Sequence, residues 1–365
     1  MSEKYQYSCG CFMSNAGSKH SLVSVVGRVT SDAGSIDIIS TKWSLWDHIG
    51  EIKARLGIGR MNYAVAPGVY AVGKPDSQSP VLVSANYKLS FDVLRRELEG
   101  LNVWILVLDT KGVNVWCAAG KGTFGTEELV RQVSVTGLEK LVSTRTLIVP
   151  QLGAPGIAAH TVQASCGFRV IYGPIRACDI KKYLGAGMKT DPEMRRVNFG
   201  VLDRLTVSLL ELALAIKAVV LGTLFFVGLI ALTARVPAME ALKSETQLLL
   251  VLFWAAILSG TVFNAIFLPY LPGRAFSLKG GILGVLVSIG IIYITGQHLA
   301  VSAWFSFILM GSGISAFLAL NFTGASTYTS LSGVKKEIRY AIPVIITLVS
   351  CGVLLAVVHV VRSFL

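Results

Sequence analysis

The chain has 365 residues, 53% of them hydrophobic, and a formal net charge of +12. Its mean hydropathy of +0.63 excludes a wholly soluble protein, and no basic patch interleaved with aromatic residues points to nucleic acid. The length allows two domains. The six cysteines match no zinc or disulfide spacing, so in the cytoplasm we expect reduced thiols.

Residues 1–60 show little regular pattern, and we expect them to form an irregular N-terminal segment. The start, MSEKYQYSCGCFMS, lacks the apolar core of a signal peptide, so the domain that follows is expected to stay in the cytoplasm. Cys9 and Cys11 form a C-x-C pair. They are either two exposed thiols without a fixed role or a transient site for a soft metal such as mercury.

Residues 61–190 alternate between strand-like and helix-like runs, which predicts an α/β domain with a parallel sheet and helices on both faces. The near-continuous apolar run Trp104–Thr110 is typical of a strand buried on both sides. The predicted strands are 68–73, 81–86, 102–110, 145–152 and 168–174, and the predicted helices are 89–100, 125–135, 157–167 and 175–184.

Ligands of such folds bind at the carboxyl ends of the strands. Three turns are predicted at that edge: the turn containing Cys117, Gln151–Gly156 and Tyr172–Arg176. Asn86 follows another strand and is also a candidate to line the site. The glycines Gly153, Gly156 and Gly173 are first of all turn residues.

The sequence NVWCAAGKGT (Asn114–Thr123) places Cys117 between a strand and a helix, with Asn114 as a predicted helix cap. A phosphate-binding loop is excluded, because Val115 stands where that motif needs glycine and Gly122 follows Lys121. A nucleophilic cysteine would need the distant His48 or His160 as its base. A buried structural cysteine and a metal-cofactor ligand are the other interpretations.

The small residues around Cys117 favour a cofactor. A thiolate is a strong, soft donor to a transition metal. Ala118, Ala119, Gly120 and Gly122 would keep the helix surface flat, so a planar macrocycle such as a corrin or haem could approach the backbone. Trp116 could belong to the core or form a wall of the cofactor site. Lys121 could face solvent or pair with a side chain of a corrin.

From residue 207 onward the chain is apolar and poor in charge, which predicts an all-α transmembrane domain (207–365) after a linker (191–206). The five predicted spans are 209–231, 248–268, 281–298, 300–322 and 341–361. Gly280 and Gly284 have the spacing that lets two spans pack closely. Glu211 and Lys217 are ionisable residues near the first span.

The charges beside these spans predict the topology, because cytoplasmic loops carry more Lys and Arg. A cytoplasmic N-terminus and five spans leave the C-terminus outside. The inner cations are then Arg195, Arg196, Arg204, Arg274, Lys279, Lys335, Lys336 and Arg339, and the outer ones are Arg235, Lys243 and Arg362.

Three segments carry a family resemblance. NVWCAAGK (Asn114–Lys121) resembles the signature of HgcA-type corrinoid proteins, the membrane-bound half of the microbial mercury-methylating pair. The segment Gly68–Leu98 resembles the corrinoid domain of that family and of the large subunit of the corrinoid iron–sulfur protein. TYTSLSGVKKEI (Thr327–Ile338) resembles a motif in the family's membrane half.

The resemblance implies a Rossmann-like corrinoid-binding domain, a cobalamin-type corrinoid and Cys117 as lower axial ligand of cobalt. It further implies methyl transfer from methyl-Co(III) to Hg(II), a donor derived from methyltetrahydrofolate, and an HgcB-like ferredoxin with iron–sulfur clusters as partner. The expected cofactor-binding residues are Asn86, Asn114, Val115, Trp116, Cys117, Ala118, Ala119, Gly120, Lys121, Gln151, Gly153, Gly156 and Gly173.

Two patterns of related families are missing. The Asp-x-His-x-x-Gly signature of other cobalamin domains is absent, which argues against a histidine lower ligand. The cysteine cluster of the corrinoid iron–sulfur protein is absent too, so electrons would come from a separate protein. Two alternatives stay open: a membrane-bound methyl carrier of one-carbon metabolism with another acceptor, and a transporter or sensor with a cytoplasmic ligand-binding domain.

Overall fold

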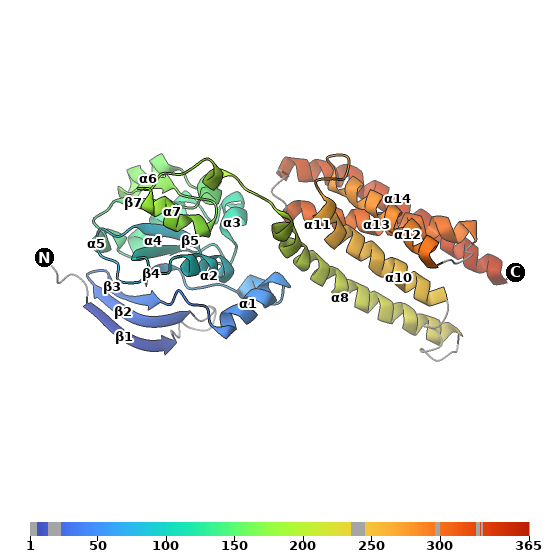
Figure 1. Ribbon diagram of the computed structural model, residues 1–365, viewed down its shortest axis with the longest axis horizontal. Coiled ribbons are helices and arrows are strands. Elements are labelled where there is room, and N and C mark those ends of the chain that lie inside the picture. Colours follow the sequence, from blue (N-terminus) through green and yellow to red (C-terminus); the bar gives the residue numbers. More distant parts are fainter. Residues whose placement is uncertain are drawn as a thin grey trace. The chain divides into compact units, whose positions relative to one another are not determined.

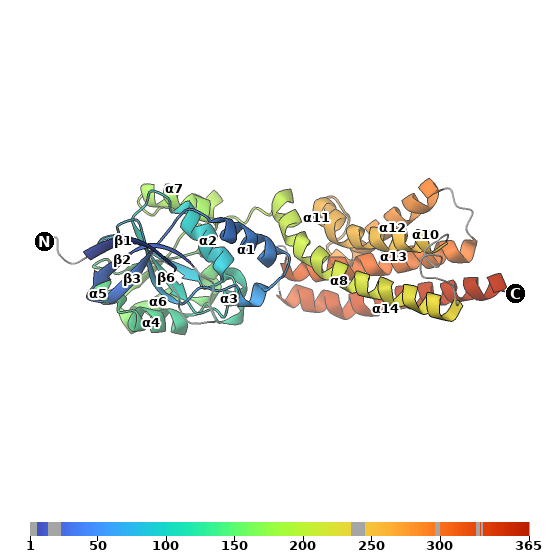
Figure 2. The same ribbon diagram turned by 90° about the horizontal axis from the view of Figure 1, so that it is seen from below.

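A computed structural model describes residues 6–13, 23–234, 245–295, 300–325, 329 and 331–364. The chain divides into two compact units (Figures 1 and 2). The first, an α/β unit, extends to Val197, except that the short stretch Arg55–Gly57 groups with the second. The second, a helical unit, comprises Asn198–Leu365. Each unit is described by itself.

The α/β unit contains, in the described part of the chain, one eight-stranded sheet with the order β1-β2-β3-β4-β6-β5-β7-β8. Strands β6, β5, β7 and β8 are parallel to one another, as the alternating pattern predicts. The strands are β1 (Gln6–Met13), β2 (Ser24–Ser31), β3 (Gly34–Ile39), β4 (Gly68–Val72), β5 (Val81–Ala85), β6 (Val103–Leu108), β7 (Thr146–Val149) and β8 (Arg169–Tyr172).

Strand β4 departs from the predicted parallel sheet, because it runs antiparallel to β6. Only residues 73–80 separate β4 from β5, and they form no helix. A parallel crossover needs about a dozen residues or more. The short connection therefore reverses the chain, and the sheet is mixed.

The expectation of an irregular segment over residues 1–60 is wrong for the described residues. Strands β1, β2 and β3 form an antiparallel meander that joins the sheet through β3 and β4. Helix α1 (Leu45–Arg55) follows. Burial alternates along β2, but the hydrophobic pattern of its sequence does not follow it. Val26 is apolar yet exposed, and Gly27 has no side chain at a buried position. Pairing with the sheet edge supplies the stability that this weak pattern lacks.

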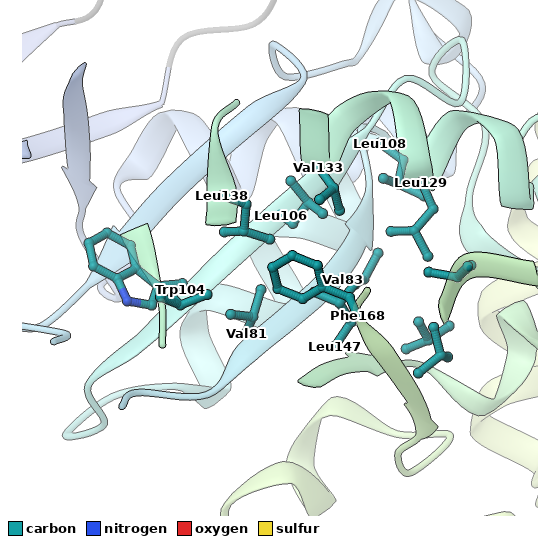
Figure 3. Packing of buried hydrophobic residues seen from close by; sticks show 14 of the residues in the cluster. Val81, Val83, Trp104, Leu106, Leu108, Leu129, Val133, Leu138, Leu147 and Phe168 are labelled. Carbon is teal, nitrogen blue, oxygen red and sulfur yellow. The ribbon is translucent and has the colours of Figure 1, made fainter. Parts of the chain in front are cut away.

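Helices cover both faces of the sheet, as predicted. On one face, α4, α5 and α6 pack over Trp104, Leu106 and Leu108 of β6 (Figure 3). On the other face, α2 and α7 pack over Val103, Ile105 and Val107. The helices are α2 (Lys88–Glu97), α3 (Val115–Lys121), α4 (Thr126–Val135), α5 (Leu138–Leu141), α6 (Ala159–Cys166) and α7 (Ile180–Gly185), with 3-10 helices η1 (Arg60–Asn62), η2 (Gln151–Gly156), η3 (Ala177–Asp179) and η4 (Glu193–Arg195).

In the helical unit, four helical stretches in the described residues are long and apolar enough to cross a membrane: Leu250–Phe267, Phe276–Ile294, Val301–Gly324 and Ser332–Val358. These overlap the last four predicted spans. The first predicted span lies in α8 but is not among the four, so five spans are not confirmed. The helices are α8 (Val201–Ala234), α10 (Glu245–Leu258), the π-helix η5 (Ser259–Phe263), α11 (Asn264–Phe267), α12 (Phe276–Thr295), α13 (Val301–Asn321), the 3-10 helix η6 (Phe322–Ala325) and α14 (Leu331–Phe364).

The predicted linker 191–206 is correct only in its first part, because α8 begins at Val201. The Asp203 carboxylate accepts a hydrogen bond from the Gly200 N–H (3.2 Å) and so supports this helix start. The close packing predicted for Gly280 and Gly284 is confirmed. A Cβ at Gly280 would lie 2.4 Å from the Ala319 Cβ, and one at Gly284 would lie 2.6 Å from the Gly311 carbonyl oxygen.

Candidate functional site

The loop after β6 is held by Asn86, which follows the neighbouring strand β5. The Asn86 Oδ1 accepts hydrogen bonds from the backbone N–H of Thr110 (3.1 Å) and of Gly112 (2.9 Å), and the Thr110 hydroxyl lies 2.8 Å away. The Asn86 Nδ2 donates to the Asp109 carboxylate (3.2 Å). Asn86 is only 2% exposed. Its amide therefore fixes the loop that leads to Cys117.

Asp109 and Glu128 support the same loop from the other side. The Asp109 N–H donates to the Glu128 carboxylate (2.8 Å) in the first turn of α4. Burial raises the pKa of both carboxyl groups. Hydrogen bonds outweigh this effect and bring each pKa below its ordinary value. Asp109 accepts from Lys111, and Glu128 accepts from Arg131 and Gln132. Both groups are therefore acceptors at neutral pH.

Asn114 caps α3, as predicted. Its side-chain oxygen accepts a hydrogen bond from the Cys117 N–H (2.9 Å). Cys117 thus lies in the first helical turn, with its residue half-buried. At the other end of α3, Gly122 has a positive φ of 81° and closes the helix. The backbone that carries the Cys117 thiol is therefore held at both ends of a seven-residue helix.

The small residues of α3 divide into two groups. Ala118 and Ala119 are buried and face the sheet core. Gly120 is exposed, and a Cβ built on it would meet no atom within 4 Å. Lys121 is exposed, whereas Val115 and Trp116 are half-buried. Gly120 therefore leaves an open patch beside Cys117. The expectation that Ala118 and Ala119 keep this surface flat is wrong, because both are buried in the core.

Helix α3 packs against η2, and two glycines make this approach close. A Cβ at Gly156 would lie 2.1 Å from the Phe124 carbonyl oxygen and 3.2 Å from the Ala119 Cα. A Cβ at Gly153 would lie 2.4 Å from the Phe124 ring. Both glycines therefore keep η2 against the segment that carries Cys117. Gly173 is tight as well, since its Cβ would lie 2.9 Å from Ile148 Cγ2.

Two buried polar atoms lie on these packed segments without a hydrogen-bond partner: the Gln151 Oε1 on η2 and the Thr123 Oγ1 after α3. A buried polar atom without a partner costs about 1–3 kcal/mol. Each such atom calls for an explanation, and a bound ligand or water that completes the bonding is one. Gln151 was a candidate from the sequence, whereas Thr123 was missed because only its burial distinguishes it.

The other candidates are separate from this arrangement. His160 is exposed on α6, and His48 packs edge-on against Trp43 (5.1 Å between ring centroids). Neither shares a described contact with Cys117. The side chains of Cys9 and Cys11 lie outside the described residues. Among the residues that were described, no group of three His, Cys, Asp or Glu side chains gathers as a metal site.

The motif-like segment Thr327–Ile338 is described only in part, because residues 326–328 and 330 lie outside the description. Within the described part, the Glu337 carboxylate accepts hydrogen bonds from the Ser277 N–H (2.7 Å) and hydroxyl (2.9 Å). Glu337 therefore caps the N-terminus of α12.

Residues 45–184 match the family model of the CO dehydrogenase/acetyl-CoA synthase delta subunit, CdhD. This range covers less than half of the chain and lies within the α/β unit apart from Arg55–Gly57. It contains α1, the Asn86 loop and the Cys117 helix.

Three curated relatives illustrate the similarity. The acetyl-CoA decarbonylase/synthase complex subunit gamma of Methanothermobacter thermautotrophicus is 31% identical over 145 residues (38% of this chain, 31% of the relative). The gamma subunit of Methanocaldococcus jannaschii is 37% identical over 97 residues (26% and 20%). The corrinoid/iron–sulfur protein large subunit of Moorella thermoacetica is 27% identical over 119 residues (32% and 26%).

The chain thus spans about a third or less of the length of these relatives. The matched segment is related to corrinoid/iron–sulfur proteins and to subunits of acetyl-CoA synthase complexes.

Proposed function

We propose that this chain is a membrane-bound corrinoid protein of the HgcA type. It transfers a methyl group to inorganic Hg(II), with the Cys117 thiolate as the lower axial ligand of cobalt. The observation that carries the proposal is the geometry of α3. The Asn114 cap fixes the backbone N–H of Cys117, and a Cβ added at Gly120, three residues further along the helix, would meet no atom within 4 Å.

The residues present fit a corrinoid. Cys117 offers a soft donor, and Gly120 leaves room for a ring. Gln151 and Thr123 carry buried polar atoms that a corrin amide side chain can satisfy. When bound, a corrinoid supplies a cobalt-bound methyl group for an electrophile such as Hg(II), and a thiolate below cobalt favours this transfer by donating charge.

The protein's own contribution is to hold the thiol in place. Asn86 fixes the loop, Asn114 fixes the Cys117 N–H, and Ala118 with Ala119 anchors α3 on the core. A donor held in advance would need little reorganisation when it binds a metal. Val115, Trp116, Lys121, Gly153, Gly156 and Gly173 are proposed to surround or shape the same surface.

The partners follow from the chemistry. The six cysteines match no iron–sulfur spacing, so we assign electron supply to an HgcB-like ferredoxin and methyl supply to a donor derived from methyltetrahydrofolate. Two thiols at Cys9 and Cys11 are proposed as an accessory mercury site. Four helices are long and apolar enough to cross a membrane, and we assign the protein to a membrane on this ground. Its proposed orientation has a cytoplasmic N-terminal domain and an external C-terminus.

A second candidate is a membrane-bound methyl carrier of one-carbon metabolism with an acceptor other than mercury. The relatives favour it, because their names place them in acetyl-CoA decarbonylase/synthase complexes or describe a corrinoid/iron–sulfur protein. Both candidates use the same cofactor and the same cysteine. They differ only in the acceptor.

The test is to purify the full chain anaerobically from a corrinoid-supplied host, as wild type, Cys117→Ala and Cys166→Ala. Cys166 is the matched control, a half-buried thiol whose Sγ donates to the Val162 carbonyl (3.2 Å) in α6. We expect a cobalamin spectrum that shifts only in Cys117→Ala, and methylmercury formation that only this variant loses. A colourless, folded wild type would overturn the corrinoid assignment. A corrinoid-loaded protein that methylates a thiol or nickel acceptor but not Hg(II) would select the second candidate.

A further inference from the structure

Helix α1 has the reverse of the usual polarity for a helix on a globular domain. Asp47 and Ala54, seven residues apart, point inward and are 5% and 1% exposed. Leu45 and Ile52 point outward and are 72% and 58% exposed. Positions seven apart share one face of a helix. The face with Asp47 is therefore buried, and the face with Leu45 and Ile52 points outward.

The inward face is fixed by ionic contacts. Asp47 binds the Lys88 ammonium (2.7 Å) and the Arg95 guanidinium (2.9 Å), and the Ser44 N–H donates to the same carboxylate (2.8 Å). Lys88 and Arg95 are themselves buried on α2. Rotating α1 to bury its apolar face would separate these buried charges, which costs several kcal/mol. The outward face is therefore held in place.

The outward face is a continuous apolar stripe. Leu45, Ile49, Ile52 and Leu56 follow the helical spacing of three and four residues, with Ile49 and Leu56 half-buried. Trp46, 72% exposed, borders the stripe on one side. Two further exposed apolar residues, Ile58 (50% exposed) and Met61 (70% exposed), follow the helix in the chain. We call Leu45, Ile49, Ile52 and Leu56 the α1 stripe.

We infer that the α1 stripe is a membrane-surface contact, on which α1 lies parallel to the bilayer. Three observations select a bilayer. A tryptophan borders the stripe, and tryptophan is enriched at the headgroup level. Lys42 and Lys53, both exposed, lie beside it and match anionic headgroups. The same chain carries four helices apolar enough to span a membrane, so the α/β unit is tethered to a bilayer through the chain.

The experiment is photo-crosslinking on the full chain in nanodiscs of phosphatidylethanolamine and phosphatidylglycerol. Benzoylphenylalanine replaces Trp46 or Ile52, one at a time. Val135 on α4, 69% exposed, is the negative control, and Leu354 on α14, 68% exposed, is the positive control. These side chains point away from the core, so the replacements leave the fold intact. Adducts are identified by mass spectrometry.

We expect lipid adducts at positions 46 and 52 at least about tenfold above position 135, because an interfacial helix buries its apolar face in the headgroup boundary. Replacing phosphatidylglycerol by phosphatidylcholine should reduce these adducts and leave those at position 354 unchanged. Adducts to the chain itself would show that protein covers the stripe, and would overturn the inference. So would the absence of adducts at 46 and 52 while 354 reacts with lipid.

Discussion

The side-chain oxygen of Asn86 lies 2.9 Å from the Gly112 backbone nitrogen, a contact that joins residues on adjacent strand ends, 26 positions apart. Through this bond β5 positions the loop that starts the Cys117 helix. Asn86 was expected to line a cofactor site, yet its side-chain hydrogen bonds go to the loop. Through these bonds it positions the segment that leads to Cys117.

Asn86→Ala should weaken this loop. The N–H groups of Thr110 and Gly112 would both lose an acceptor, which costs about 1–3 kcal/mol per buried donor. Hydrogen exchange at residues 109–113 should accelerate, and the cobalt-sensitive absorption bands should broaden. The control is Gln163→Ala, an exposed amide on α6. Unchanged exchange in Asn86→Ala would refute the positioning role.

Asn114→Ala should remove the cap of α3 and destabilise it by about 1 kcal/mol. Asn114→Ser keeps a side-chain acceptor and should restore most of the loss. The measurement is hydrogen exchange of the Cys117 amide, together with the spectrum of the corrinoid-loaded chain. Equal behaviour of the alanine and serine variants would mean that the cap is irrelevant.

Gly120→Ala should separate folding from cofactor binding. The added methyl group meets open space, and alanine favours a helix interior over glycine by about 0.5–1 kcal/mol. Thermal stability should therefore rise slightly. Gly120→Leu should fold equally well but lose the corrinoid, because its side chain would occupy the patch beside Cys117. Full corrinoid occupancy in Gly120→Leu would remove this patch from the site.

Gly153→Ala should destabilise the α/β unit, because its Cβ would lie 2.4 Å from the Phe124 ring. Overpacking of this kind costs about 1–3 kcal/mol. Phe124→Leu, combined with Gly153→Ala, should recover part of the loss, since the clash is with a side chain. A double-mutant cycle on thermal unfolding checks this, and strict additivity would contradict it.

Acid should weaken the attachment of α1. Burial raises the pKa of Asp47, but hydrogen bonds from Lys88 and Ser44 lower it well below its ordinary value. A carboxyl group whose pKa is lowered by folding stabilises the folded state. This stabilisation is complete above the pKa of the group in the unfolded chain, about 3.9, and is lost as pH falls through its pKa in the folded protein. The contribution should be flat from pH 8 to about 5, then decline. Asp47→Asn should lower the free energy of unfolding by about 3–5 kcal/mol at pH 7, as measured by urea unfolding. The decline of stability below pH 5 should be smaller in this variant.

The sequence predicted the parts of the fold that depend on local pattern. The apolar run of β6 identified a buried strand, and Asn114 identified the start of α3. The direction of β4 was missed, because it depends on the length of residues 73–80 rather than on composition. The meander was missed because Val26 and Gly27 disturb its alternation. The partners of Asn86 lie 23 to 26 residues away, and no short pattern encodes that distance.

The seven residues of α3 have a consequence for how the protein assembles. An isolated helix shorter than about 12 residues is unstable in water, so α3 cannot form before its neighbours. It needs β5 to supply Asn86, and η2 to pack beside Phe124. The Cys117 helix is therefore completed late in folding. A nascent or partly unfolded chain would therefore not present the thiol in its final geometry.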